Sequence, residues 1–589
     1  MTITKSKWAV LTALFTIHCS LFVSSVAAQS LNVSVDTVGN LAKQLPEDTR
    51  FKVAELKVSG KLNGADLKLL SQIVTRTKTN KKVADECLVT SIDLSEAEIT
   101  EGKEGMKTEA NTLPNSLFAS AKSLVKAVLP NNTISIGRNC FDNCSSLTEV
   151  IIPETVVTIG ANAFSDCTSM REVRLPSMLT KIEHDAFEDC TSLVVIDIPA
   201  SVVELEANAF TGCKSLTKVT INGNIKEIKD ATFQDCEALA EISVPESVRS
   251  VGNNAFRGCK SLTAITLSDD LKEIGNSAFE KCGSLTTISI NKVDKIGSNA
   301  FQECTSLKEF DVESVNKIGN GAFQKCLSLK TVSIKGSLSE LGMQTFSDCS
   351  NLSTISLPNS IKKIESRVFE NCKSMEQIEL PVSLAKINDH VFENCSSLKS
   401  IEIPTTVKDM GSSVFENCTA LETAVIKGFV DEIESDVFRN CHNLTSVTLP
   451  VSVKKIGTKA FQECTNLISI ELPITLQVID NDAFEKCSSL AHITIPAAVR
   501  SIGSDAFREC SQLASVDLSV GLKEIGGSAF AKCVSLREVN INAPLPPKIS
   551  KSTFKDIVLG ACKFYVPKGC KTLFMQDKQW QKIPQILEK

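Results

Sequence analysis

The sequence predicts an α/β repeat solenoid, built from about 19 repeats of 23 residues that stack on one another. Three observations predict this fold. Cysteine recurs every 23 residues between Cys144 and Cys533, with two units of 22, and in all eighteen units a phenylalanine precedes the cysteine by three residues. A leucine or methionine follows each of these cysteines by three residues. One unit has too few apolar residues to fold alone, so the units must share a continuous core.

The first element of each unit is expected to be a short helical turn. Ala163, Phe164, Cys167 and Met170 fall at i, i+1, i+4 and i+7, which is one face of a helix. Two residues before the phenylalanine, as at Asn162, twelve of the eighteen units carry Asn, Asp or Ser, which are common helix N-caps. This pattern predicts a helix start in most units.

The phenylalanines and cysteines are expected to form a buried structural ladder, exemplified by Phe164, Cys167, Phe187, Cys190, Phe210, Cys213, Phe438, Cys441, Phe507 and Cys510. The competing interpretation is a disulfide framework, which is common in exported proteins. Stacked side chains point in parallel, whereas a disulfide needs them turned toward each other, so mostly free thiols are expected. Cys562 and Cys570 are the candidates for a true pair, and Cys87 and Cys140 remain unassigned.

The second element is a short strand. Val173 and Leu175 alternate with Glu172 and Arg174 before Pro176, which indicates a half-buried strand ended by a turn. A further apolar pair, such as Leu179 and Ile182, is expected to line the opposite wall. Successive strands should then form one long parallel sheet.

The ends of the chain differ from the repeats. Residues 1–28 read as a secretory signal peptide, with Lys5 and Lys7 before an apolar run and Val26 and Ala28 placed for cleavage. A membrane anchor is the weaker alternative, because Thr and His residues interrupt the apolar run. No later segment has the roughly 20 apolar residues that a membrane span needs. The mature chain is therefore expected to be secreted or at the cell surface.

Capping regions are expected on both sides of the solenoid, which spans residues 111–542. Residues 29–110 form the N-terminal cap, in which Val53-Leu56-Val58 and Val89-Ile92-Leu94 follow the strand template and Asn63-Gly64 opens a helical stretch. Residues 543–589 form the C-terminal cap, a degenerate repeat with the strand-like segment Lys563–Pro567 and a helix-like tail around Trp580.

Composition excludes several function classes. Without the signal peptide the chain has 61 basic and 69 acidic residues, a net charge of minus eight, and no clustered basic surface for nucleic acid. The five histidines are far apart and no paired CxxC occurs, so neither a metal site nor a cofactor is expected. A near-uniform repeat also offers no pocket of unlike titratable groups, and an enzyme is not expected.

The template Leu-x-x-Ile-x-Ile-Pro followed by Ile-Gly-x-x-Ala-Phe-x-x-Cys-x-Ser-Leu resembles that of the BspA-like leucine-rich-repeat surface proteins. Residues 147–170, 442–467 and 490–513 show it clearly, and the leader at 56–70 and the tail at 564–570 resemble those of family members from Gram-negative anaerobes. The resemblance implies a right-handed superhelix with a concave parallel sheet and short helical turns on the convex side. It also implies a surface or secreted protein of a family in which some members adhere to host matrix proteins or other cells.

The residue between the two inward positions of each strand is expected to face the concave surface. The charged members of this stripe are the candidate binding residues, namely Arg174, Asp197, Asp311, Glu379, Glu402, Glu471 and Asp517. The stripe contains no aromatic residue, although Trp, Tyr and Arg dominate most binding hot spots. The alternatives are a merely solvated sheet, or an acidic cluster near Glu379, Glu402 and Glu471 that meets a basic patch on a protein.

Two function hypotheses remain. The first is a non-enzymatic, adhesin-like scaffold that contacts host or neighbouring-cell proteins, including extracellular-matrix proteins, by weak contacts repeated along the solenoid. The second is a structural surface-layer protein that associates weakly with itself.

Overall fold

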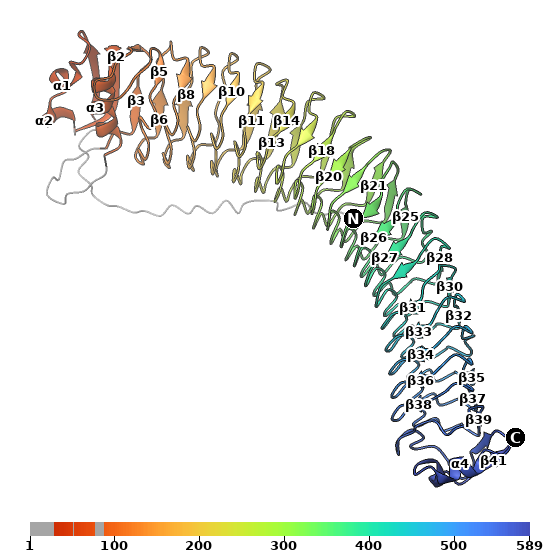
Figure 1. The fold of residues 1–589 in the computed structure, drawn as a ribbon. Helices are drawn as coiled ribbons and strands as arrows, with labels where there is room; N and C mark the ends of the chain where they lie inside the picture. Colours follow the sequence, from red (N-terminus) through yellow and green to blue (C-terminus); the bar gives the residue numbers. More distant parts are fainter. Residues whose placement is uncertain (1–28, 51, 77–87) are drawn as a thin grey trace, which may run out of the picture.

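The computed structural model describes residues 29–50, 52–76 and 88–589, and the predicted signal peptide and Cys87 lie outside these ranges. The chain winds into a parallel β-solenoid of about 24 coils, where a coil is one full turn of the solenoid. Figure 1 shows that the solenoid bends into a long arc with a cap at each end. The predicted repeat solenoid is therefore confirmed.

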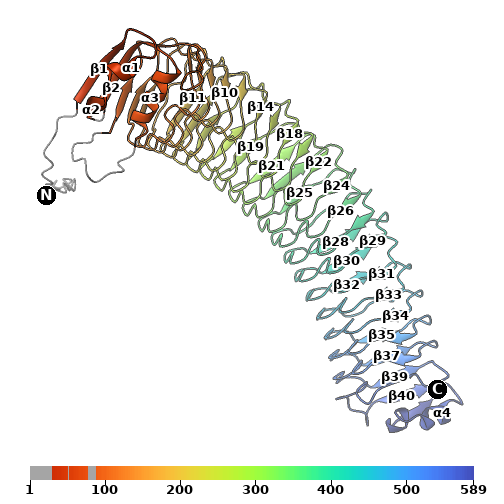
Figure 2. The same ribbon diagram turned by 60° about the vertical axis from the view of Figure 1, so that its left-hand side comes forward.

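Two series of strands follow the arc, and every paired neighbour within them is parallel. We call them the long-strand sheet and the short-strand sheet. Figure 2 shows both series following the arc, for example β28, β30 and β32 in the first and β29, β31 and β33 in the second. The long strands are β1 (Gln29–Val35), β2 (Val53–Leu62), β3 (Ser91–Asp93), β6 (Lys126–Val128), β8 (Glu149–Ile151), β11 (Val195–Ile198), β13 (Lys218–Ile221), β15 (Glu241–Ser243), β17 (Ala264–Thr266), β19 (Thr287–Ser289), β21 (Glu309–Val312), β23 (Thr331–Ile334), β25 (Thr354–Ser356), β28 (Ser400–Ile403), β30 (Thr423–Ile426), β32 (Ser446–Thr448), β35 (His492–Thr494), β37 (Ser515–Leu518), β39 (Glu538–Ile541), β40 (Lys563–Val566) and β41 (Ile586–Glu588).

The short strands arise from the second apolar pair of each unit, which was expected to line the opposite wall. They are β4 (Ala97–Ile99), β5 (Thr112–Leu113), β7 (Ser135–Ile136), β9 (Thr158–Ile159), β10 (Lys181–Ile182), β12 (Glu204–Leu205), β14 (Glu227–Ile228), β16 (Ser250–Val251), β18 (Glu273–Ile274), β20 (Lys295–Ile296), β22 (Lys317–Ile318), β24 (Glu340–Leu341), β26 (Lys363–Ile364), β27 (Lys386–Ile387), β29 (Asp409–Met410), β31 (Glu432–Ile433), β33 (Lys455–Ile456), β34 (Val478–Ile479), β36 (Ser501–Ile502) and β38 (Glu524–Ile525).

The predicted helical turns are wrong. Between the end of α3 at Val74 and the start of α4 at Lys571, the described residues contain no helix. The Phe164 N–H donates to the Ala186 carbonyl of the next coil at 2.8 Å instead of to a residue four positions earlier. The segment around each phenylalanine is thus a tight turn whose hydrogen bonds join neighbouring coils.

The predicted N-cap positions belong to this turn. The residue two before the ladder phenylalanine has a positive φ in all eighteen units, for example 54° at Asn162 and 59° at Asp185. The residue two after it does so as well, for example 56° at Asp166. Asn and Asp enter the left-handed region more easily than other residues with a side chain, which explains their frequency here.

The buried phenylalanine and cysteine ladder is confirmed. Consecutive phenylalanine rings stack nearly parallel, as for Phe187 and Phe210 with centroids 5.3 Å apart. The ladder side chains from Phe141 and Cys144 to Phe530 and Cys533 have no exposed surface. All cysteines of the described residues are free thiols, including Cys562 and Cys570, so the candidate disulfide between those two is not formed.

The long strands do not form the one continuous sheet that was expected. Proline ends the strand on successive coils at 130, 153, 176 and 199, at 358, 381 and 404, and at 450, 473 and 496. These three runs of coils contain seven interfaces between neighbours that both carry a strand-ending proline, and six of the seven have no strand pairing. The coils of Val173, Ile378 and Ile470 have no long strand. At the same position Asn222 donates its N–H to the Ile198 carbonyl at 3.0 Å, a bond that proline cannot make. We call these three coils the proline openings.

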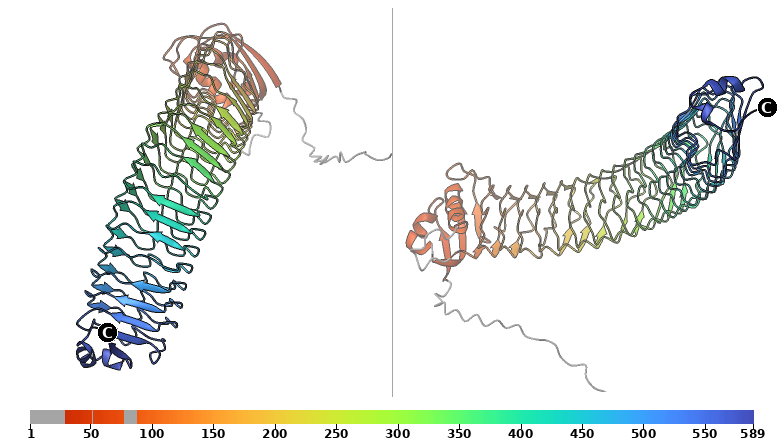
Figure 3. Two further views of the ribbon diagram at one scale, coloured as in Figure 1. Left: turned by 90° about the vertical axis from the view of Figure 1, so that its right-hand side faces the viewer. Right: turned by 90° about the horizontal axis from the view of Figure 1, so that it is seen from below.

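Within residues 29–50, 52–76 and 88–589, helices occur only in the caps (Figure 3). The N-terminal cap holds α1 (Leu41–Gln44), α2 (Glu47–Arg50) and α3 (Gly64–Val74), and the C-terminal cap holds α4 (Lys571–Gln576) and the 3-10 helix η1 (Trp580–Lys582). The Asn63 and Asp66 side chains form a capping box that begins α3, as the sequence predicted for this stretch. Among the described residues, none of the helices is long and apolar enough to pass through a bilayer.

Both caps continue the stack. In the N-terminal cap β2 pairs with β3, which pairs with β6 of the first repeats. In the C-terminal cap β39 pairs with β40 and β40 with β41. The Trp580 ring is fully buried, and its Nε1–H donates to the Pro547 carbonyl at 2.7 Å. The caps thus cover the last core residues at each end.

Candidate functional site

The candidate binding residues lie on the outer face of the wall that carries the long strands. Asp197, Asp311, Glu402 and Asp517 are residues of long strands, whereas Arg174, Glu379 and Glu471 lie in the three proline openings, which have no long strand. Arg174, Asp197, Asp311, Glu379, Glu402 and Glu471 are exposed, and Asp517 is half-buried. Their neighbours along the strand, such as Ile401 and Ile403 beside Glu402, are buried because successive side chains of a strand point to opposite faces. The alternation that the sequence predicted is therefore present.

Several of these charges are already paired. Arg174 binds the Glu154 carboxylate at 2.8 Å, and the Ser177 N–H and hydroxyl also donate to Glu154. These two Ser177 bonds, with a smaller contribution from Arg174, hold the pKa of Glu154 below its usual range. Glu402 pairs with Lys427 at 2.6 Å.

The expected acidic cluster of Glu379, Glu402 and Glu471 does not form one patch. Glu379 and Glu402 lie on neighbouring coils, whereas Glu471 lies three coils beyond Glu402, and Lys427 neutralises Glu402. Asp517 accepts a hydrogen bond from Asn540 at 2.8 Å and lies 3.5 Å from His492. The charged stripe is thus a series of separate local sites.

The most acidic of these sites is a hollow around Asp311. Asp269, Glu309, Asp311 and Glu313 line it together with Ile288 and Ile290, and its volume is about 740 Å³. It lies between β19 and β21, which do not pair, at the first of the two 22-residue units. An isolated bridge between Lys292 and Ser314 joins the two coils just beyond the ends of these strands. Lys335 pairs with Glu313 at 2.6 Å. We call this feature the acidic hollow.

Two further hollows lie at proline openings. The first, of about 790 Å³, surrounds Val173 and includes Arg174 and Asp197. The second, of about 650 Å³, surrounds Ile470 and includes Glu471, His492 and the exposed side chain of Ile474. In this opening Leu472, which occupies the position of a strand residue in other coils, is only partly buried. Four of the candidate binding residues therefore lie in hollows, namely Arg174, Asp197, Asp311 and Glu471.

An apolar ridge borders the long-strand sheet in the C-terminal half. Its members lie just after the position where a long strand ends or, in the proline openings, where one would end, and they are 55–81% exposed: Val382, Phe429, Val451, Ile474 and Val520. The equivalent positions of the N-terminal half are mostly polar or small, as at Glu154, Ser177 and Gly223. The ridge was not predicted from the sequence, although Val382, Val451, Ile474 and Val520 keep the 23-residue spacing of the repeats; Phe429 lies one residue beyond that register.

No metal site was expected, yet the structure brings His390, Glu393 and Glu416 together on two adjacent coils. The sequence signal was hidden because Glu416 lies 26 residues from His390. Only the stacking of coils makes them neighbours. Glu309 and Glu313 were not predicted for a different reason: each lies two residues from Asp311 on the same coil, and only the stripe position itself was considered.

The repeats match a family of known proteins. The model of the BspA type leucine rich repeat region matches residues 111–240, 226–353, 316–445 and 431–559, which together are well over half of the chain. No match is found among curated proteins.

Solved structures of leucine-rich-repeat proteins are also similar. A protein from Bacteroides ovatus is 24% identical, with 79% of this chain and 90% of that chain covered and a TM-score of 0.27. A cell surface protein from Faecalibacterium prausnitzii is 26% identical over 55% of this chain and 87% of its own, with a TM-score of 0.33. A Treponema pallidum protein is 32% identical over 26% of this chain and 72% of its own, with a TM-score of 0.25.

These TM-scores are low, and the family assignment rests on the repeat model alone. That model covers the same residues that carry the phenylalanine and cysteine ladder and both strand series. The chain belongs to the BspA type leucine rich repeat family.

Proposed function

We propose that this protein is a secreted or cell-surface scaffold of the adhesin kind, which binds proteins of a host or a neighbouring cell through its long-strand sheet. The acidic hollow carries the proposal: four carboxylates of Asp269, Glu309, Asp311 and Glu313 line one concavity, and only Glu313 has a lysine partner among the described residues. Such a site favours a basic segment of a protein partner, because complementary charge raises the association rate and selects against acidic partners.

The other hollows extend this binding face. Each is shallow and open, so a single contact is expected to be weak. Hollows at Val173, at Asp311 and at Ile470 are spread along one rigid solenoid. A partner that engages two of them gains affinity through effective concentration without new contacts at either site.

A binding screen tests this function. Residues 29–589 are applied to immobilised extracellular-matrix proteins, mucins, glycans and whole cells at low and high salt. We expect saturable binding to at least one protein, weakened by salt because exposed charges are screened. The absence of saturable binding to every member of the panel would contradict the adhesin proposal.

Self-association is the second candidate, and the apolar ridge favours it. Sedimentation of residues 29–589 is expected to show concentration-dependent species if two ridges pack together. Val451→Lys with Ile474→Lys should then abolish them, whereas Val203→Lys, which changes a 55% exposed valine outside the ridge, should not. A monomer at all concentrations would exclude this candidate.

A further inference from the structure

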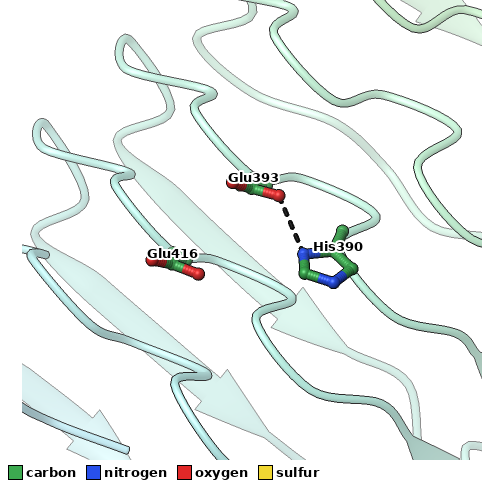
Figure 4. Close-up of side chains that lie close together, drawn as sticks. All are labelled: His390, Glu393 and Glu416. Atoms are coloured by element: carbon green, nitrogen blue, oxygen red, sulfur yellow. Dashed lines mark hydrogen bonds and ion pairs between the residues drawn. The ribbon is translucent and has the colours of Figure 1, made fainter. Parts of the chain in front are cut away.

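Three side chains with metal-binding atoms meet on the surface of two adjacent coils. His390 Nδ1 lies 2.8 Å from Glu393 Oε2, and the metal-binding atoms of His390, Glu393 and Glu416 all lie within 4.8 Å of one another. Figure 4 shows the imidazole and both carboxylates on adjacent coils, turned toward a common space. Around a tetrahedral ion with bonds of about 2.0–2.2 Å, ligand atoms are roughly 3.3 Å apart, so small side-chain rotations suffice.

The charges around this group leave an excess of negative charge. Glu370, Glu393 and Glu416 occupy the position after the ladder phenylalanine on three successive coils, which happens nowhere else in the repeats. Arg367 binds Glu370 at 2.7 Å and reaches Glu393 only at 3.9 Å. Arg439 is shared between Glu416 at 3.2 Å and Asp436 at 3.6 Å. Two arginines thus face four carboxylates around one imidazole.

The coils that carry these residues are held rigidly. The Asn394 amide donates to the Asn371 side chain at 2.9 Å, and the Asn417 amide donates to Asn394 at 2.9 Å. Each asparagine directly follows one of the glutamates Glu370, Glu393 and Glu416. This asparagine ladder fixes the spacing of the coils, and a preorganised set of donors loses less entropy when it binds an ion.

We propose that His390, Glu393 and Glu416 form a binding site for a divalent transition-metal ion of the zinc class, which clamps two neighbouring coils. One imidazole with two carboxylates suits zinc, whereas calcium and magnesium prefer oxygen ligands alone. Three protein ligands leave a fourth position for water. The site would add a cross-link at the middle of the arc, independently of any protein partner.

Equilibrium dialysis of residues 29–589 against micromolar zinc, followed by elemental analysis, tests the site. The wild-type chain is expected to retain one zinc ion per molecule at this site in the presence of millimolar calcium. His390→Asn, Glu393→Gln and Glu416→Gln are each expected to weaken this binding at least tenfold. Zinc should also raise the unfolding midpoint of the wild-type chain and leave that of His390→Asn unchanged.

Two matched controls distinguish this site from nonspecific zinc binding by a single surface histidine. His184 lies 2.7 Å from Asp185, and His492 lies 3.5 Å from Asp517, so each imidazole faces one carboxylate. His184→Asn and His492→Asn should leave zinc retention unchanged. The proposal is overturned if the wild-type chain retains no zinc, if the controls lose as much as His390→Asn, or if calcium displaces the ion.

Discussion

Each ladder cysteine does more than fill space. Its S–H donates to the carbonyl of the phenylalanine in the preceding coil, as Cys259 does to Phe233 at 3.2 Å. That carbonyl also accepts the Cys236 N–H of its own coil at 3.3 Å. The thiol therefore ties two coils together inside the core, which alanine or valine could not do.

Removing one such thiol should destabilise the stack. Cys259→Ala loses the bond to Phe233 and leaves a small cavity, so the free energy of unfolding is expected to fall by about 1–2 kcal/mol in urea titrations. Cys570→Ala is the control, because Cys570 is half-buried and outside the ladder. A loss at Cys259 no larger than at Cys570 would contradict a structural role for the ladder thiol.

The residue pattern predicted which positions are buried, but it did not predict the local backbone conformation. Spacing of Ala163, Phe164, Cys167 and Met170 predicted a helical face, and all four are buried as predicted. A stacked turn places the same residues inward, so periodicity alone could not separate the two. Asn162 and its equivalents were ambiguous as well, because asparagine favours both helix N-caps and left-handed φ.

Among the described residues, runs of strand-ending prolines coincide with three of the five interruptions of the long-strand sheet; the other two separate β15 from β17 and β19 from β21. The single proline at Pro358 leaves β25 paired with β23, but the next coil, at Pro381, has no strand pairing. The sequence already contained this signal, since runs of successive prolines are visible at the strand ends. The prediction of one long sheet was wrong because each proline was considered only as the end of its own strand. Proline also lacks the backbone N–H that would donate a hydrogen bond to the neighbouring coil.

Replacing strand-ending prolines with residues that have a backbone N–H should restore strand pairing across a proline opening. Pro176→Asn with Pro199→Asn, which copies the residue type found at Asn222, is expected to extend pairing through the coil of Val173. Residues 172–175 form no strand, so their amides are expected to exchange rapidly in the wild-type chain. Hydrogen exchange measured by mass spectrometry should slow at these residues in the variant. Exchange in residues 218–221 is the internal reference, and unchanged exchange at 172–175 would contradict the role given to the prolines.

For the whole molecule, the sequence predicted the solenoid and its register, because the 23-residue period constrains every coil at once. It could not predict the hollows. The acidic hollow combines residues from three coils, and Asp269 lies 44 residues from Glu313. Such sites depend on where the sheet separates, which the strand template of a single unit does not contain.

The ladder makes stability sensitive to alkaline pH. Burial raises the pKa of the Cys144 and Cys395 thiols to about 12, from an ordinary value of 9.0. Between these values an unfolded chain has ionised its thiols while the folded chain keeps them protonated. The free energy of unfolding is therefore unaffected below pH 9 and falls as pH rises toward 12, by up to about 1.4 kcal/mol per thiol per pH unit.

Urea midpoints between pH 8 and pH 10.5 in the presence of reductant check this dependence. The wild-type midpoint should fall steeply above pH 9. A variant with Cys259, Cys282 and Cys304 replaced by alanine is expected to show a shallower decline. Equal slopes for the two chains would show that the ladder thiols do not titrate as described.

The most direct test of the proposed binding face is a matched pair of charge reversals, assayed on whichever protein partner the screen identifies. Glu309→Lys with Asp311→Lys changes the acidic hollow, and Glu227→Lys with Glu340→Lys makes the same charge change at exposed positions of the short-strand sheet. We expect the first pair to weaken binding at least tenfold and the second to leave it within twofold. Equal loss in both pairs, or loss only in the second, would contradict binding through the long-strand sheet.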